Sequence, residues 1–319
     1  MRILITGAGG FVGGYLAQAL RRVCDEANVV PTGTTSGEHP ILGSVTAMDI
    51  TDVAAVTSMI DRYNPTHIIN LAGLAVPAVA SANPMAAWQV HVHGVLNLAG
   101  AILDKAPDCW LLNAGSGLVY GESAKSGLPL DENALLVPVD EYAVTKAAAD
   151  LALGALTRRG LKCIRFRPFN HTGAGQSGAF VIPAFAMQIA QIEAGLAAPV
   201  IHVGNLDAER DFLDVRDVVD AYVLALQSAE ALHEPAPILN IASGVPQRIG
   251  DILEHFLRHS RVSISVEQDP ARLRPSDLPR IIGDSSRLRQ RLGWAPKYTL
   301  DETLATVLED CRARIGELG

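Results

Sequence analysis

A tyrosine and a lysine four residues apart, Tyr142 and Lys146, are the side chains of this sequence best suited to acid-base chemistry. Residues 141–146 predict a helix, on which side chains at i and i+4 are neighbours. An adjacent ammonium favours the phenolate, and lowering a tyrosine pKa by about 3 units from about 10 takes about 4 kcal/mol. We therefore expect Lys146 to make Tyr142 a usable acid or base near neutral pH. The same spacing also occurs where both side chains only cover apolar surface, so other motifs must decide.

A glycine-rich turn follows the first expected strand, which is the apolar run at residues 2–6. Gly7, Gly10 and Gly13 are spaced as GxxGxxG, and an amphipathic helix is expected next, over residues 15–20. Glycines let the backbone turn tightly and approach a pyrophosphate, whose charge the N-terminus of the helix favours. Strand, turn and helix in this order indicate a dinucleotide site.

Further buried strands are expected at residues 29–32, 65–73 and 109–113, and each ends in small residues. Apolar runs separated by helical segments are typical of a parallel sheet buried on both faces. Ligands of such sheets bind at the carboxyl ends of the strands. Ser116, which follows residues 109–113, is therefore expected on the ligand side of the sheet.

The loop after the strand at 29–32 bears on the choice between NAD and NADP. An acidic residue commonly holds the ribose hydroxyls of NAD at this point, and this loop has Thr34, Thr35 and Ser36 instead. The hydroxyl groups can donate hydrogen bonds to a 2′-phosphate, so NADP(H) is favoured. The loop contains no arginine, so NAD(H) remains possible, and an ordinary polar turn is the alternative.

Composition narrows the functional classes. The 26 basic and 34 acidic residues of the 319-residue chain leave a formal net charge of −8, which disfavours nucleic-acid partners. The four cysteines, Cys24, Cys109, Cys163 and Cys311, lack the spacing of a metal site, and we expect no metal and reduced thiols. No apolar run is long enough for a membrane span, and we expect a soluble, cytoplasmic protein without a membrane partner.

Together these motifs resemble the extended short-chain dehydrogenase/reductase family, the NAD(P)-dependent nucleotide-sugar epimerases, dehydratases and reductases. The resemblance covers nearly the whole chain. It implies an α/β fold, a Rossmann doubly wound parallel sheet with a smaller C-terminal α/β substrate-binding lobe. The implied catalytic residues are Ser116, Tyr142 and Lys146. The implied cofactor contacts are Gly7, Gly10, Phe11, Val12, Gly13, Thr34, Asp49, Ile50, Leu71, Ala72, Gly73, Tyr142, Lys146 and Phe169.

The second half looks like GDP-mannose 4,6-dehydratases and GDP-4-keto-6-deoxy-mannose reductases, on the segments 165–176, 178–183, 203–206, 210–218 and 269–277. The likeness implies that Asn170 meets the diphosphate or the sugar and that Arg210 and Arg274 clamp the diphosphate and nucleoside. It also implies that Asp277 accepts hydrogen bonds from the ribose. The implied substrate contacts are Ser116, Asn170, Val181, Arg210, Arg274 and Asp277. The alternatives are an ion pair of Arg210 with Asp211 or Asp214 and a solvated Arg274.

We expect the Rossmann domain at residues 1–168 plus roughly 214–242 and the nucleotide-sugar lobe at roughly 169–213 plus 243–319. Homodimerisation through helices near 91–104 and 142–156 is expected from the family.

Three positions depart from the family pattern. Leu118 stands where the dehydratases use a glutamate for elimination and where the reductases often keep an acidic residue too, and it cannot transfer a proton. His91 replaces a usual asparagine, and Gly73 a common alanine. The sequence alone gives no functional account of the last two changes, and His91 and His93 are more typical of packing or surface positions than of a metal site.

The resemblance implies a reductase of the C4 ketone of a GDP-4-keto-6-deoxyhexose, forming GDP-D-rhamnose, with 6-deoxy-D-talose as the other possible product. NADPH would supply the hydride, Tyr142 the proton and Ser116 a hydrogen bond to the ketone oxygen. Lys146 would also bind the nicotinamide ribose. The alternatives are a GDP-mannose 4,6-dehydratase, a nucleotide-sugar 4-epimerase and a dinucleotide-sensing protein, which would not need the three catalytic residues.

Overall fold

The computed structural model of the chain describes residues 1–25, 28–232, 236–273 and 278–317. Its largest element is an eight-stranded sheet in the order β11-β7-β6-β5-β1-β2-β4-β3, in which β3 alone pairs antiparallel. The α/β Rossmann architecture expected from the sequence is confirmed. The strands are β1 (Ile3–Thr6), β2 (Val29–Gly33), β3 (Gly37–His39), β4 (Gly43–Ala47), β5 (His67–Asn70), β6 (Trp110–Ala114), β7 (Lys162–Pro168) and β11 (Ile238–Ile241).

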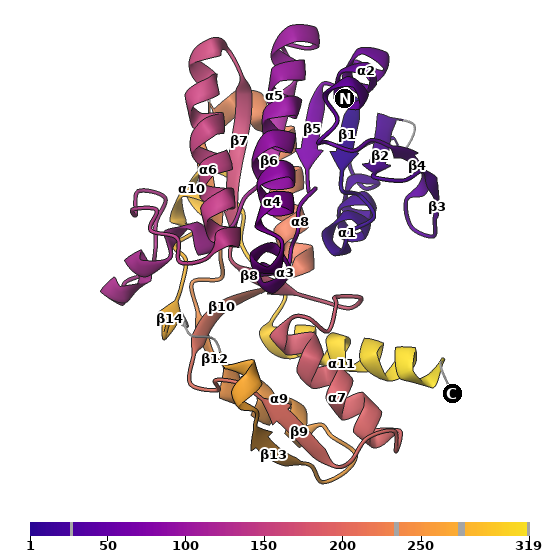
Figure 1. The fold of residues 1–319 in the computed structure, drawn as a ribbon, viewed down its shortest axis with the longest axis vertical. Coiled ribbons are helices and arrows are strands. Elements are labelled where there is room, and N and C mark those ends of the chain that lie inside the picture. Colours follow the sequence, from indigo (N-terminus) through magenta and orange to yellow (C-terminus); the bar gives the residue numbers. More distant parts are fainter. Residues whose placement is uncertain (26–27, 233–235, 274–277, 318–319) are drawn as a thin grey trace.

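Helices cover both faces of this sheet because its strands are apolar on both sides (Figure 1). Along β1, Ile3 and Ile5 join the core with α1 and α8, whereas Leu4 joins the core with α2, α5 and α6. The helices are α1 (Phe11–Leu20), α2 (Val53–Tyr63), α5 (Gly94–Lys105), α6 (Glu141–Leu156) and α8 (Val215–Gln227). Short helices α3 (Pro77–Ala82) and α4 (Pro84–Trp88) and a π-helical turn, Gln89–His93, lead into α5.

A second lobe lies beyond the carboxyl ends of the parallel strands (Figure 1). Its strands are β8 (Asn170–Thr172), β9 (Val200–Val203), β10 (Glu209–Asp214), β12 (Pro246–Arg248), β13 (Ser265–Gln268) and β14 (Arg280–Ile281). The helices α7 (Val181–Glu193), α9 (Ile249–Arg258) and α11 (Leu300–Gly316) pack around one apolar core.

The segment after β14 returns to the large sheet. Leu288 of α10 (Ser286–Leu292) and Trp294 are buried in its core, although the expected domain division put both residues in the second lobe. Asp284 accepts a hydrogen bond from the Ser286 N–H at 2.7 Å, at the start of α10. The domain bounds themselves stay a prediction.

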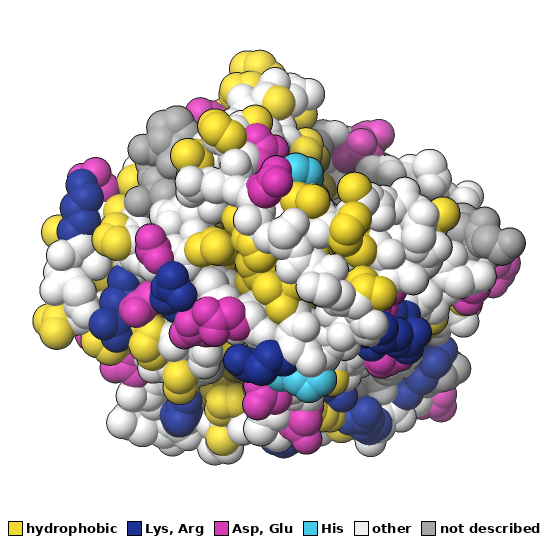
Figure 2. Space-filling model, turned by 90° about the horizontal axis from the view of Figure 1, so that it is seen from below, with side chains coloured by type: hydrophobic (Ala, Val, Ile, Leu, Met, Phe, Trp, Pro, Cys, Tyr) yellow, Lys and Arg dark blue, Asp and Glu magenta, His cyan; other side chains and the backbone are white. Residues whose placement is uncertain are grey.

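The surface at the end of the second lobe mixes all side-chain classes (Figure 2). Acidic and basic side chains lie beside one another there, and hydrophobic side chains run between them. Within the described part of the chain, no helix has the length and apolar character needed to cross a membrane.

Candidate active site

A cavity of about 1550 Å³ extends from the glycine turn to the second lobe. It is lined by every predicted site residue within the described ranges, from Gly7 at one end to Arg210 at the other. The remaining two predicted residues, Arg274 and Asp277, lie outside the described residues. The fold thus brings together side chains that are up to about two hundred positions apart in the chain.

The glycine turn forms one end of this cavity, and two of its glycines are required by space. Gly7 has a φ of +64°, and a Cβ there would lie 2.7 Å from the backbone of Ala72. A Cβ on Gly13 would lie 1.9 Å from the Ala8 carbonyl oxygen. Helix α1 begins here without a side-chain cap and without an acidic residue in its first turn. A turn this close to β5, with helix N–H groups directed at the cavity, fits a dinucleotide pyrophosphate.

The end of the cavity at which we expect the adenosine lies beside β2 and β4. Thr34 and its neighbours Thr35 and Ser36 are exposed and line the cavity, together with Asp49 and the buried Ile50. The Asp49 carboxylate accepts hydrogen bonds from the Thr51 N–H at 2.9 Å and the Thr51 hydroxyl at 2.8 Å. These contacts fix the segment that would face the adenine.

Ser116, Tyr142 and Lys146 meet where β6 ends against α6. The Ser116 side chain is buried, and its Oγ accepts the Leu118 N–H at 3.1 Å, so its own proton is directed elsewhere. The Lys146 Nζ donates to the Ala114 carbonyl at 3.0 Å and lies 5.9 Å from the centre of the Tyr142 ring. A phenol, a hydroxyl and an ammonium therefore border one part of the cavity.

The expected lowering of the Tyr142 pKa is wrong for the protein alone. Burial raises the pKa of Tyr142 to about 12, and the interaction with the Ser116 side chain only partly opposes this. Burial also lowers the pKa of Lys146 to about 8. The cause is that desolvation acts on both groups, while Lys146 is directed at the Ala114 carbonyl. At neutral pH, Tyr142 is consequently protonated, which suits a proton donor.

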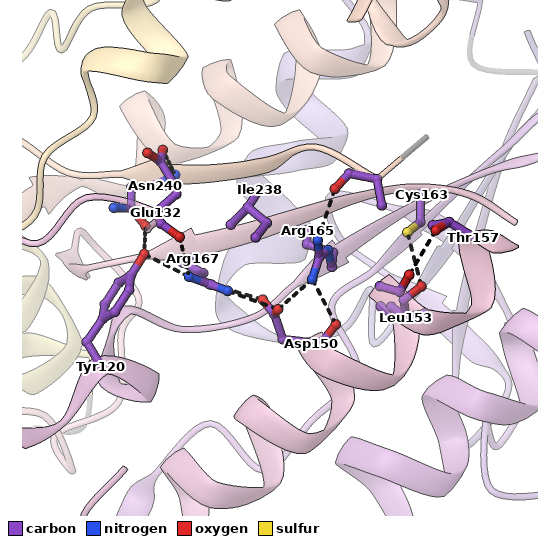
Figure 3. A network of polar contacts seen from close by, with 12 residues as sticks. Tyr120, Glu132, Asp150, Leu153, Thr157, Cys163, Arg165, Arg167, Ile238 and Asn240 are labelled. Carbon is purple, nitrogen blue, oxygen red and sulfur yellow. Dashed lines mark hydrogen bonds and ion pairs between the residues drawn. The ribbon is translucent and has the colours of Figure 1, made fainter. Parts of the chain in front are cut away.

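A buried polar network joins α6 to β7 (Figure 3). Asp150 of α6 pairs with Arg165 and Arg167 of β7, each at 2.9 Å. Arg167 also donates to the Tyr120 hydroxyl at 3.0 Å, and that hydroxyl donates to Asn240 at 2.7 Å. The network joins α6, which carries Tyr142, to strand β7 and to the segment around Tyr120. Buried ion pairs of this kind tolerate little displacement.

The other end of the cavity belongs to the second lobe. Asn170 begins β8, Val181 begins α7, and Arg210 lies in β10, which pairs with β8. Arg210 donates to the Glu209 carbonyl at 2.8 Å. Asp211 and Asp214 are the alternative partners considered for Arg210. The Asp211 carboxylate accepts hydrogen bonds from the backbone N–H groups of residues 243, 244 and 283. The Asp214 carboxylate pairs with Arg216.

Several cavity residues were not singled out from the sequence as site residues. The most prominent are Leu74, Gln176, His202, Asn205 and Arg272. Arg272 and Asn205 lie in segments that carried the subfamily likeness, which was the available signal. Leu74 gave none, because its place depends on how the loop after β5 packs against α6.

The sequence matches the model of a known family and is similar to known proteins. Residues 4–307 match the model of a family described as GDP-mannose 4,6 dehydratase. The chain belongs to this family. It is 34% identical to the GDP-6-deoxy-D-mannose reductase of Pseudomonas aeruginosa over 319 residues, which cover 99% of each chain. The resemblance inferred from the motifs is therefore confirmed.

Two solved structures have the same fold over nearly the whole chain. The structure of RMD from Pseudomonas aeruginosa complexed with NADPH matches with a TM-score of 0.84 and 32% identity, covering 98% of this chain and 100% of that one. The UDP-glucose 4-epimerase of Thermus thermophilus in complex with NAD has a TM-score of 0.84 and 26% identity, covering 98% and 99%.

Proposed function

We propose that the chain is an NAD(P)H-dependent reductase of the C4 ketone of a GDP-4-keto-6-deoxyhexose. The proposal is supported by the similarity to the GDP-6-deoxy-D-mannose reductase and by the three groups that border one part of the cavity. The observation that carries it is that the buried Ser116 and Tyr142 line the cavity together with Lys146, whose Nζ lies 5.9 Å from the centre of the Tyr142 ring.

In this proposal Tyr142 holds the proton that the ketone oxygen receives. The Ser116 hydroxyl, whose oxygen already accepts the Leu118 N–H, donates a second hydrogen bond to the same oxygen. The ammonium of Lys146 stabilises the phenolate that remains on Tyr142. The bound nicotinamide supplies the hydride. Burial excludes water and strengthens each of these interactions.

Leu118 argues against the dehydratase. Its side chain packs between Tyr142 and the cluster around Tyr120, and an alkyl group cannot carry a proton. The carboxylate of Asp140 also lines this part of the cavity, but it caps α6 by accepting the Ala143 N–H at 2.8 Å. Elimination of water needs a separate acid or base near the sugar. Leu118 cannot serve as one, and one oxygen of Asp140 is engaged at the start of α6.

We assign NADP(H) as the preferred cofactor. The hydroxyl groups of Thr34, Thr35 and Ser36, which line the cavity, can donate hydrogen bonds to a 2′-phosphate. Calorimetric titration with NADPH and NADH tests the assignment, and equal or tighter binding of NADH would reverse it.

The decisive experiment is oxidation of NADPH with a panel of GDP-, UDP- and dTDP-4-keto sugars, with NMR of the product to read the configuration at C4. Turnover with the GDP-4-keto-6-deoxy sugar is expected. Conversion of GDP-mannose to a 4-keto product with oxidised cofactor would identify a dehydratase. Cofactor that stays bound through purification, with no net NADPH oxidation, would identify an epimerase.

A homodimer and a cytoplasmic location complete the proposal. Leu96 of α5 and Leu151 of α6 are exposed, with 38% and 61% of their surfaces accessible, on the two helices expected at the interface. All four cysteines are free thiols, as is typical of a reducing compartment. Light scattering of the wild type and of Leu151→Glu tests the dimer, which the variant should weaken.

A further inference from the structure

The two unexplained departures from the family, His91 and Gly73, lie against each other beside the catalytic groups. His91 lies in the π-helical turn before α5 and is 1% exposed. A Cβ on Gly73 would lie 3.2 Å from His91 Nε2, 3.3 Å from His91 Cδ2 and 3.4 Å from Lys146 Nζ. Gly73 has no positive φ, so its backbone is open to alanine, and only the space is limiting.

The hydrogen bonds of His91 fix its protonation and link two elements. The Leu74 N–H donates to Nε2 at 2.9 Å, so the proton of the neutral ring is on Nδ1. Nδ1 lies 2.8 Å from the Thr145 hydroxyl oxygen and donates to it. Thr145 in turn donates to the carbonyl oxygen of Glu141 or Tyr142, at 3.0 and 2.9 Å. The imidazole thus joins the loop after β5 to the first turns of α6.

The ring also borders the catalytic pair directly. It packs edge-to-face on Tyr142, with ring centres 5.5 Å apart. The titratable groups that face it are Tyr142 and Lys146 of α6, since the loop residues 71–74 carry none. Burial and the charge of Lys146 lower the pKa of His91 to about 3, so the ring stays neutral and does not repel the ammonium.

We propose that His91 is a positioning residue that holds Tyr142 and Lys146 in place, and that Gly73 is the residue that makes room for it. An asparagine at 91 is shorter and does not span from the Leu74 N–H to Thr145, whereas an alanine at 73 crowds the imidazole and the ammonium. The two positions therefore depend on each other. This inference rests on the proposed reductase function.

A double-mutant cycle of His91→Asn, Gly73→Ala and the double variant tests the dependence. We expect each single change to lower kcat about 10-fold and the double variant to return to within about 3-fold of the wild type, because contacting residues are not additive. Cofactor affinity should stay within about 2-fold in His91→Asn, because His91 does not line the cavity. Unaltered single variants, or a double variant whose loss is the product of the single losses, would overturn the proposal.

A readout without turnover separates this proposal from the function itself. NMR of the ¹³C-labelled Lys146 side chain reports its pKa, which should rise in His91→Asn as water gains access, and fall back in the double variant. A Lys146 pKa unchanged by His91→Asn contradicts the positioning role even if the wild type proves to be no reductase. If the wild type oxidises no NADPH but the Lys146 pKa changes as expected in the variants, only the proposed reductase function is contradicted.

If His91→Asn fails to fold, variants of Thr145 test the same hydrogen bond between His91 and Thr145. Thr145→Ser keeps the hydroxyl that accepts from His91, and Thr145→Val keeps the shape without it. Turnover should survive in the serine variant and fall about 10-fold in the valine variant. Equal turnover in both, measured on folded protein, counts against the positioning role.

Discussion

In one part of the cavity, Ser116 and Lys146 are fixed by backbone groups and Tyr142 is buried, whereas at the second-lobe end Asn170 and Arg210 line the cavity from strands. Each catalytic group is desolvated, and small displacements there change the reaction itself. The second-lobe end, which we propose holds the nucleotide, offers the long, charged side chain of Arg210, which tolerates displacement at the expense of affinity. Changes among the catalytic groups should therefore appear in kcat, and changes at the second-lobe end in KM.

The largest effect is expected for Tyr142→Phe. Phenylalanine fills the same space but has no proton to donate, and loss of a general acid lowers kcat by about 10³-fold to 10⁴-fold. Cofactor affinity should stay near that of the wild type, as measured by titration with NADPH. A variant that turns over like the wild type would remove the phenol from the mechanism.

Lys146→Met should lower kcat by about 10²-fold to 10³-fold, because no cation then stabilises the phenolate. Since the pKa of Lys146 in the ligand-free protein is lowered to about 8, the ammonium is lost as pH rises through 8, and wild-type kcat/KM should fall along an alkaline limb there. Steady-state kinetics across this pH range checks both expectations.

The same substitution reports on stability. The folded lysine binds fewer protons than the unfolded one between pH 8 and 10.5, so this group costs stability below pH 8. With partial exposure taken into account, Lys146→Met should raise the free energy of unfolding at pH 7 by about 1–3 kcal/mol, as read from urea titration. A less stable variant would contradict the desolvation of Lys146.

Gly13→Ala should weaken cofactor binding by about 10²-fold, because a Cβ within 1.9 Å of the Ala8 carbonyl must displace the turn. Gly14→Ala is the matched control on the same helix, since its Cβ meets only the end of the Ile41 side chain, at 3.4 Å. Calorimetric titration of both variants checks the difference. Equal affinities would show that the turn yields without loss.

Arg210→Gln should give the smallest effect, a rise in KM of about 10-fold with kcat little changed, since one charged contact to a phosphate is removed. The matched control is Arg248→Gln on the neighbouring strand β12, whose guanidinium pairs with Asp207 and Asp251 instead. Steady-state kinetics checks both. A fall in kcat at constant KM would place Arg210 with the catalytic groups and contradict the distinction between them and the second-lobe end of the cavity.

Much of the cavity was predictable because its features are local. The spacing of Gly7, Gly10 and Gly13 could be read directly, since only glycine fits where a Cβ would strike Ala72 or Ala8. The helix of Tyr142 and Lys146 and the strand before Ser116 followed from periodicity and apolar runs. The fold class followed from the order of these elements.

The tertiary structure alone decided the electrostatics and the partners. The spacing of Tyr142 and Lys146 predicted a lowered phenol pKa, but burial by α3, α4 and the loop after β5 raises it, and no local pattern reports that desolvation. Likewise His91 and Gly73 were two unrelated departures in the sequence and became neighbours only in the fold. Sequence determines which residue types each turn, strand and helix can accept, whereas water exclusion and contacts between distant segments arise only once the chain is packed.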